Sequence, residues 1–392
     1  MRLTTKRFNY FQLACIFSVP LLFPSFDKRE FIQVFQIESS LFSILVGNLF
    51  LWLIGLGIIS MSSIERLNAI ENTQNHFGGH GKTVVALLFF VTFVMWFYFR
   101  INTAVDDICR LWGIETKWIG VLLGLASTGL SVFGLRLLKW VTTLFFPFFV
   151  VYNLYIFYSS ERMNGILLQE WSLSFPIVIS TILVALPGVV NLPTIFRHAK
   201  SRIESYLGLT LLVFLICFFE VSMLFVTTKK EVFINTAFSW VVYVAFIFFN
   251  IICSNILNLI FASACLEQWW RWRRSLLSLL IGLIASGFYY IFHLSSQVNL
   301  ILGLLNVYIS CVGVVLIASY LIKIAFKKTF KWMNLMGLIL SCLVVTLNHF
   351  KYGEDQISSF TSAIGICALF YLCMVFLKES IWSFRGIFLE KK

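Results

Sequence analysis

Charged residues are scarce in this chain of 392 residues: Asp, Glu, Lys and Arg make up 12% of it, whereas hydrophobic residues make up 59%. A soluble domain has about a quarter of its residues charged, so a solvated globule is excluded. The same apolar excess excludes a disordered chain, because there is ample surface to bury. The sequence therefore predicts a protein whose main solvent is the lipid bilayer.

Disulfide patterns, metal-binding patterns and catalytic sets are also missing. The nine cysteines are odd in number and none forms a Cys-x-x-Cys pair, which is typical of small buried hydrophobic residues rather than of disulfides. The five histidines show no His-Glu-x-x-His pattern, and no Ser-His-Asp arrangement is visible. We therefore expect no metal centre, no cofactor and no enzymatic activity.

Long apolar runs, in contrast, are abundant. A hydrocarbon core of about 30 Å needs about 20 apolar residues per helix. Twelve blocks of suitable length predict an all-α polytopic membrane protein with a single transmembrane domain over 1–392. No small-x-small cleavage site follows the first block, so we expect it to be a span rather than a signal peptide. The expected spans are 9–26, 41–61, 84–105, 117–134, 138–158, 175–192, 206–226, 239–263, 275–293, 298–322, 333–350 and 357–377.

Basic residues differ in number between the two sides of this topology. If the N-terminus is cytoplasmic, the inside segments carry 21 Lys and Arg residues and the outside loops carry 8. Because basic residues accumulate on the cytoplasmic side, the split predicts a multi-pass protein of the inner (plasma) membrane with both termini cytoplasmic. It also accounts for most of the net charge of +12, so we expect no nucleic-acid partner. The oligomeric state is left open.

Proline is rare, and its placement is uneven. Five of the six prolines fall in the first block or in and directly after the sixth: Pro20, Pro24, Pro176, Pro187 and Pro193. Proline removes a backbone donor and clashes with the preceding turn. We therefore expect both helices to be interrupted, the first near Ser18–Val19 and the sixth near Pro187–Gly188.

These two blocks are five spans apart and run in opposite directions. That spacing is typical of an inverted repeat of two five-helix halves, each beginning with a broken helix, with a binding site near the bilayer midplane. We expect the first repeat over about 9–158 and the second over about 175–322. Two further helices then lie over about 333–377. The arrangement predicts a transporter.

The order of several short fragments is more informative than any one of them. The fragments are Gly47-Asn48-Leu49, the loop His76-Phe77-Gly78-Gly79-His80-Gly81, Thr92 with Trp96-Phe97, Pro147, Arg197-His198-Ala199-Lys200-Ser201 and Asn250-Ile251-Ile252-Cys253-Ser254-Asn255. In this order they resemble the nucleobase–cation symporter family, especially its bacterial cytosine permease branch. The resemblance implies the leucine-transporter-type fold of the APC superfamily, with spans 1, 2, 6 and 7 as a moving bundle. It also implies a planar nitrogen heterocycle as substrate, with Na⁺ or H⁺ coupling.

The resemblance also implies a substrate site. Trp96 lies near mid-depth in the third span, where the family stacks a tryptophan on the substrate, and Phe93 takes the place of a polar residue one turn earlier. Asn250 and Asn255 lie on the eighth span. An asparagine amide offers donors and an acceptor in one plane, which suits the edge of an amide-like ring. We expect these four residues to line the site together with Ser18 and the Pro187–Gly188 break.

A cation site is expected beside it. Ser254 shares a helix face with Asn250, four residues earlier, and its hydroxyl oxygen is a hard ligand suited to Na⁺. Cys253 stands where the family has a threonine. Backbone carbonyls freed by a break near Val19 would complete the shell, and H⁺ remains the other coupling ion.

Arg100 and Glu220 are the clear intramembrane charges, on the third and seventh spans. Such residues usually line a substrate or ion pathway or form a charge pair with one another. One interpretation is a charge pair that gates the outer side. In others, Arg100 extends toward Asp106 and Asp107, or Glu220 carries a proton.

The sequence as a whole predicts a secondary transporter of a small planar nitrogenous solute, such as a nucleobase, that works by alternating access. Two alternatives are an amino-acid or polyamine permease of the same fold, and a receptor or sensor of that fold that binds a solute without transporting it.

Overall fold

The computed structural model describes residues 7–21, 37–63, 66–112, 117–159, 173–226, 237–270, 272–291, 295–326, 331–352 and 365. Apart from one isolated backbone bridge, the regular elements in these residues are helices. Helices satisfy each backbone N–H and C=O within one segment, as lipid requires. They are α1 (Tyr10–Leu21), α3 (Ile37–Ser63), α4 (Ala69–Trp112), α5 (Lys117–Ser131), α6 (Gly134–Ser159), α8 (Phe175–Asn191), α9 (Pro193–Phe196), α10 (Arg202–Val226), α11 (Ala237–Leu266), α12 (Arg274–Ile291), α13 (Ser295–Phe326) and α14 (Lys331–Tyr352).

These helices confirm the expected all-α membrane fold. Each of the first eleven expected spans overlaps a helix, and the twelfth, 357–377, lies outside the described residues except for residue 365. The helices α5 and α6 together form a candidate span bent by 112°. Seven further stretches of the described chain are long and apolar enough to cross a membrane: Leu41–Ser63, Ala69–Asp106, Arg202–Val221, Phe248–Leu266, Arg274–Ile291, Ile301–Ile324 and Lys331–Asn348. The chain is therefore a multi-pass membrane protein.

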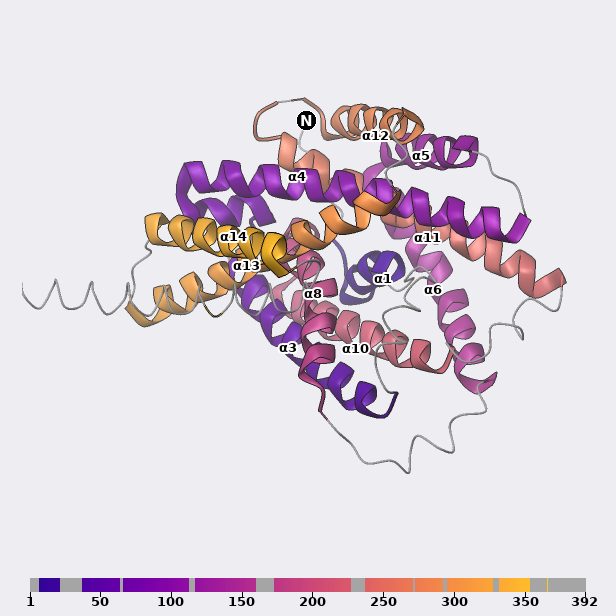
Figure 1. Cartoon of the computed structure of the whole chain (residues 1–392), viewed down its shortest axis with the longest axis horizontal. Coiled ribbons are helices and arrows are strands. Elements are labelled where there is room, and N and C mark those ends of the chain that lie inside the picture. The colour runs from indigo at the N-terminus through magenta and orange to yellow at the C-terminus, as the bar shows by residue number, and fades with distance from the viewer. Residues whose placement is uncertain are drawn as a thin grey trace, which may run out of the picture.

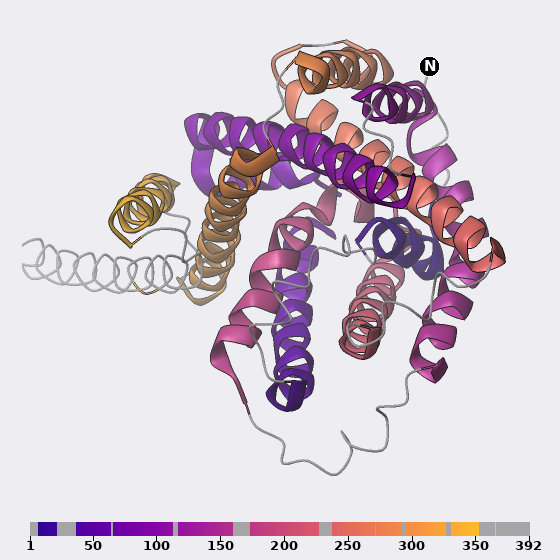
Figure 2. The ribbon, with the colours of Figure 1, turned by 45° about the vertical axis from the view of Figure 1, so that its right-hand side comes forward.

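Two groups of helices meet around α1. The long helix α4 packs against α11, α13 and α14, and α5 packs against α12 (Figure 1). In the other group, α3 packs against α8 and α10. The helix α1 contacts both groups, because it packs against α10, α6 and α11. Figure 2 shows α3, α8 and α10 below α4, with α1 between the two groups. Side chains of α1 are thus held where the groups meet.

Helix α4 begins earlier than expected and includes the segment 76–81, for which a loop was predicted. A capping box starts it: the Glu71 N–H donates to Asn68 Oδ1 over 2.6 Å, and the Asn68 N–H donates to Glu71 Oε2 over 2.7 Å. Only Gly78 departs from helical geometry, with φ 76° and ψ −172°. A glycine adopts this φ at no steric cost, so the helix changes direction there and then resumes.

Gly78→Ala is expected to destabilise the protein. This combination of φ and ψ is essentially restricted to glycine, and another residue held in it costs about 1–3 kcal/mol, so the melting temperature of the purified protein should fall. Gly79→Ala is the matched control, because Gly79 is exposed and an added Cβ there meets nothing within 4 Å. Equal melting temperatures for the two variants would contradict the assigned role of Gly78.

The expected positions of the two helix breaks are wrong. Helix α1 continues through Ser18–Val19 and Pro20 to Leu21, and Pro24 lies outside the described residues. Helix α8 continues through Pro187 and ends only at Asn191. A proline removes one backbone hydrogen bond and bends a helix, but the bonds on either side maintain it. The sixth span is divided instead at Leu192, immediately before Pro193 starts α9.

Candidate functional site

Trp96 is held in a defined orientation on α4. Its Nε1–H donates to Asn306 Oδ1 of α13 over 3.2 Å. The edge of its ring meets Phe99, with ring centroids 5.4 Å apart, and the Arg100 guanidinium lies 5.5 Å from the ring centroid. The polar edge of the indole is thus bound by a second helix, which fixes the plane of the ring. The sequence argument missed Asn306, although an asparagine inside an apolar span is a visible signal.

Phe93 belongs to a buried group of aromatic rings that joins three helices. Its ring stacks on Phe89 of the same helix, with centroids 6.0 Å apart. It also contacts Phe261 of α11 at 4.9 Å, and Phe261 in turn meets Phe17 of α1 at 6.0 Å. These contacts turn Phe93 toward α11, and Phe261 connects it to α1.

Polar atoms on α1 and α11 are buried without partners among the described residues. The Ser18 hydroxyl is one, and both amide atoms of Asn255 are others. The side chains of both residues are fully buried. A buried polar group without a hydrogen bond costs about 1–3 kcal/mol. Because such atoms are normally satisfied, they indicate a place where a polar ligand, an ion or water is bound.

The neighbouring turn of α11 supplies a hydroxyl oxygen. Ser254 is buried and donates to the Asn250 carbonyl oxygen over 3.1 Å, which leaves its oxygen lone pairs available. Asn250 and Cys253 are buried beside it. The backbone of Val19 lies in α1, which packs against α11. The predicted cation ligands therefore come from two helices in contact.

Pro187 and Gly188 lie within the unbroken α8, on the group of helices that includes α3. Pro187 is buried and Gly188 is half-buried. Because the helix continues through them, no run of freed carbonyls surrounds them. The predicted contribution of Pro187 and Gly188 to the site depended on freed backbone carbonyls, which the continuous helix does not provide.

Arg100 and Glu220, the two expected intramembrane charges, each have a defined contact in the structure. Glu220 of α10 accepts a hydrogen bond of 2.7 Å from Asn48 Nδ2 of α3. Arg100 lies over the Trp96 ring on α4. Asp106 accepts a hydrogen bond from Asn102, one turn earlier on the same helix. Glu220 thus bonds within one helix group, and Arg100 lies in the other.

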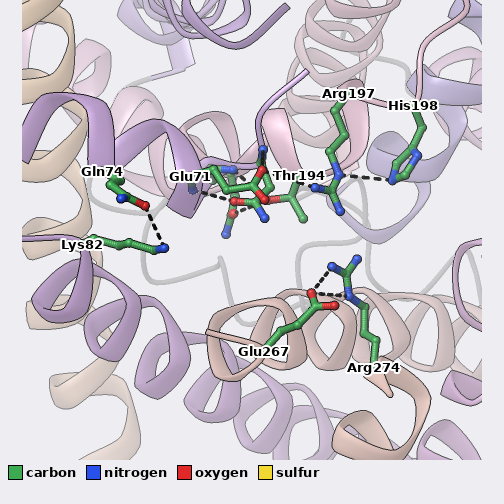
Figure 3. Close-up of polar contacts among 11 residues, drawn as sticks. Glu71, Gln74, Lys82, Thr194, Arg197, His198, Glu267 and Arg274 are labelled. Carbon is green, nitrogen blue, oxygen red and sulfur yellow. Dashed lines mark hydrogen bonds and ion pairs between the residues drawn. The ribbon is translucent and has the colours of Figure 1, made fainter. Parts of the chain in front are cut away.

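Figure 3 shows a second polar cluster, which sequence reasoning missed and which includes Glu71, Thr194, Arg197 and His198. Arg197 approaches Glu71 to 3.5 Å, and its Nε–H donates to His198 Nε2 over 3.4 Å. The Thr194 hydroxyl donates to Asn191 Oδ1 and accepts from the Ala69 N–H. These bonds connect the start of α4 to the turn after α9.

The backbone reinforces this connection. The Phe8 N–H donates to the His198 carbonyl over 2.9 Å, and the Lys200 N–H donates to the Phe8 carbonyl over 3.0 Å, in a parallel bridge. The Tyr10 N–H donates to Glu204 at the start of α10. The segment before α1 is therefore tied to the α9–α10 connection.

His198 in this cluster gives a pH-dependent prediction. Burial, with the nearby charges of Arg197 and Arg274, lowers the pKa of its imidazole to about 4. The unfolded chain, with a His pKa of about 6.5, binds the proton more readily. The contribution of His198 to stability is therefore complete above about pH 6.5 and is lost as the pH falls toward 4.

The measurement is the melting temperature of the purified protein between pH 7 and pH 4. The melting temperature of the wild type should fall as the pH is lowered, and this fall should be smaller in His198→Gln. Substitution of the exposed His80 by Gln should leave the fall as large as in the wild type. Parallel curves for His198→Gln and the wild type would contradict the prediction.

This protein is similar to known proteins in structure but not in sequence. The sequence matches no protein-family model and no curated protein sequence. The structure is similar to Mhp1, a nucleobase-cation-symport-1 family transporter, in a closed conformation with bromovinylhydantoin bound: the TM-score is 0.67 at 13% identity, over 96% of this chain and 94% of that one. It is also similar to a substrate-bound, outward-open Na⁺-coupled sialic acid symporter, with a TM-score of 0.70 at 13% identity, over 93% of this chain and 89% of that one. These matches decide the fold.

The chain has the leucine-transporter-type fold. An inward-facing structure of Mhp1 is similar as well, with a TM-score of 0.63 at 12% identity, over 96% of this chain and 92% of that one. The expected resemblance is confirmed at the level of structure. The matches extend over nearly the whole chain.

Proposed function

We propose that the protein is a cation-coupled secondary transporter of a small planar nitrogenous solute in the inner (plasma) membrane. The single observation that carries this proposal is the set of unpartnered buried polar atoms of Ser18 and Asn255. They belong to α1 and α11, which pack against each other where the two helix groups meet. Buried polar atoms without hydrogen bonds do not stabilise the packing of these helices, whereas a bound solute and ion would supply their missing partners.

The solute would bind between the two groups. Trp96, whose plane is fixed by Asn306, offers a stacking face, and aromatic stacking contributes about 1–3 kcal/mol per ring. The amides of Asn250 and Asn255 offer donors and acceptors to the ring edge. The hydantoin bound to Mhp1 is a planar nitrogen ring, which supports the same substrate class here. Movement of the α3, α8 and α10 group relative to α4 and α11 would then alternate the access.

Na⁺ is the coupling ion that the oxygen donors favour. The lone pairs of Ser254 and the Ser18 hydroxyl are hard donors on contacting helices. If they hold Na⁺, solute uptake into proteoliposomes should rise with external Na⁺, and Ser254→Ala should remove most of that dependence. Ser263→Ala is the matched control, because Ser263 is a buried serine of the same helix whose hydroxyl donates to a backbone carbonyl. Uptake that depends on pH and not on Na⁺ would assign the coupling to H⁺.

Counterflow in proteoliposomes tests the proposed function directly. Proteoliposomes that contain the protein and are preloaded with an unlabelled nucleobase or hydantoin should accumulate the labelled solute against its gradient. Competition by amino acids or polyamines, with none by nitrogen heterocycles, would instead identify a permease for those solutes. Binding without counterflow would identify a receptor.

A further inference from the structure

Three lysines from different parts of the chain lie where α4, α13 and α14 meet. The side chain of Lys331, at the start of α14, lies against α4, because its Cδ is 3.6 Å from where a Cβ at Gly78 would be. Lys82 follows Gly78 by about one turn of α4. Lys323, near the end of α13, and Lys331 both lie close enough to His76 of α4 for their charges to act on its imidazole.

A buried polar network holds these helix ends together. The Nδ1 atom of His76 lies 2.9 Å from Ser319 Oγ of α13. The Nδ2 group of Asn334 on α14 donates to the same oxygen over 2.8 Å and also to the His76 carbonyl. All three side chains are buried. Because the network joins α4, α13 and α14, it fixes the backbone positions from which the three lysines extend.

The positive charges of these lysines have no carboxylate partner among the described residues. The Lys82 ammonium donates to Gln74 Oε1 over 2.9 Å, and that amide oxygen carries no net charge. Lys323 and Lys331 are exposed. Like charges gathered in one region repel one another, so a bound anion would stabilise the arrangement.

The lysines also lie at the boundary of the apolar spans. The apolar stretch of α13 ends one residue after Lys323, and that of α14 begins with Lys331. Beside them Trp332 is 71% exposed, and Leu321 and Ile324 are exposed as well. Tryptophan and lysine are typical of the level of the lipid headgroups. Exposed aliphatic side chains next to them are suited to contact with acyl chains.

An anionic phospholipid fits this combination of groups. Its phosphate oxygens accept hydrogen bonds from several ammonium groups, and charged pairs of this kind are the stronger ones. Basic pockets between transmembrane helices are known to bind anionic headgroups. A phosphate compound dissolved in water would use the lysines but not the exposed apolar side chains, so the lipid satisfies more of the site.

We propose that Lys82, Lys323 and Lys331 bind the phosphate headgroup of an anionic phospholipid from the surrounding leaflet. The distribution of basic residues predicts that this leaflet is the cytoplasmic one. The lipid would join α14, which follows the two predicted repeats, to the long helix α4. The inference is independent of the solute that the protein carries.

The test compares two lipids with the same acyl chains. Native mass spectrometry of the purified full-length protein in a neutral detergent would measure the binding of dioleoyl phosphatidylglycerol and of dioleoyl phosphatidylcholine. The first has a net negative charge, whereas the choline cation of the second cancels its phosphate charge. The first phosphatidylglycerol to bind should do so about tenfold or more tightly than phosphatidylcholine.

Variants assign this preference to the three lysines. Replacing all three by Gln should leave the two lipids with nearly equal affinity, whereas replacing all three by Arg should retain the preference. Single Gln substitutions should each remove part of it, and they keep the test decisive if the triple variant is unstable. A matched control removes three exposed positive charges elsewhere and should behave as the wild type: Arg136→Gln, Lys200→Gln and Arg202→Gln.

Several results would overturn the inference. They are equal binding of the two lipids by the wild type, a full preference in the glutamine variants, and an equal loss of preference in the control. Soluble glycerophosphate is the remaining comparison. If it displaced phosphatidylglycerol at similar concentrations, the lysines would bind a dissolved phosphate compound, and the assignment to lipid would be wrong.

Discussion

Trp96→Ala should weaken solute binding by a factor of about 5 to 150 and abolish measurable uptake at low solute concentration. The substitution removes the ring on which the solute is proposed to stack, and it also removes the partner of Asn306. The measurement is solute affinity by titration calorimetry, together with initial uptake rates in proteoliposomes. Trp96→Phe retains an aromatic face without the N–H, so it should keep most of the affinity.

The control for Trp96→Ala is another tryptophan that faces outward. Trp118 of α5 is 61% exposed on the molecule, and its ring contacts Tyr290. Trp118→Ala should leave solute affinity unchanged. An affinity equal to that of the wild type in Trp96→Ala would remove the stacking role, and with it the principal reason for preferring a planar solute.

Asn255→Leu should abolish solute binding without lowering the melting temperature of the ligand-free protein. Both amide atoms of Asn255 are buried without partners among the described residues, so replacement by an apolar side chain of similar volume removes a desolvation cost. If Asn255 served packing instead, Asn255→Leu would lower the melting temperature and leave solute binding unchanged. The melting temperature and the solute affinity are to be measured on the same preparation.

A second buried asparagine provides the contrast. Asn334 of α14 donates to the His76 carbonyl and to Ser319 Oγ of α13 over 2.8 Å. Asn334→Leu leaves those acceptors without their donor and should lower the melting temperature by several degrees, since one buried hydrogen-bonding partner is worth about 1–3 kcal/mol. If Asn255→Leu destabilised the protein as much as Asn334→Leu does, Asn255 would have a structural role.

Some features of the site could be predicted from local patterns. Trp96, Ser254 and Asn255 are isolated polar or amphipathic residues in apolar spans, and such residues are conspicuous because their burial is costly. Their helices were predicted for the same reason, since apolar length and basic flanks are properties of neighbouring residues along the chain. The capping box at Asn68 and Glu71 is also a local signal, and it explains why α4 starts before the expected span.

Other features depend on residues that are distant in sequence. The hydrogen bond from Trp96 to Asn306 joins positions separated by 210 residues, and the contact between Asn48 and Glu220 joins positions separated by 172. No periodicity relates such pairs, because their meeting depends on how helices from the two groups cross. Glu220 of the seventh span is an example: its side chain accepts a hydrogen bond from Asn48 of α3, a partner that its position in the chain does not indicate.

The sequence by itself determined that this chain lies in a membrane as a set of apolar helices, because the cost of exposing backbone groups to lipid leaves few other solutions. It also indicated which residues are chemically unusual in that setting. The tertiary structure alone decided that α1 and α8 continue through Pro20 and Pro187, since one missing hydrogen bond is outweighed by the packing of neighbouring helices. It alone placed the unpartnered oxygen of Ser18 and the amide of Asn255 on contacting helices, because proximity across a bundle follows from three-dimensional packing rather than from order along the chain.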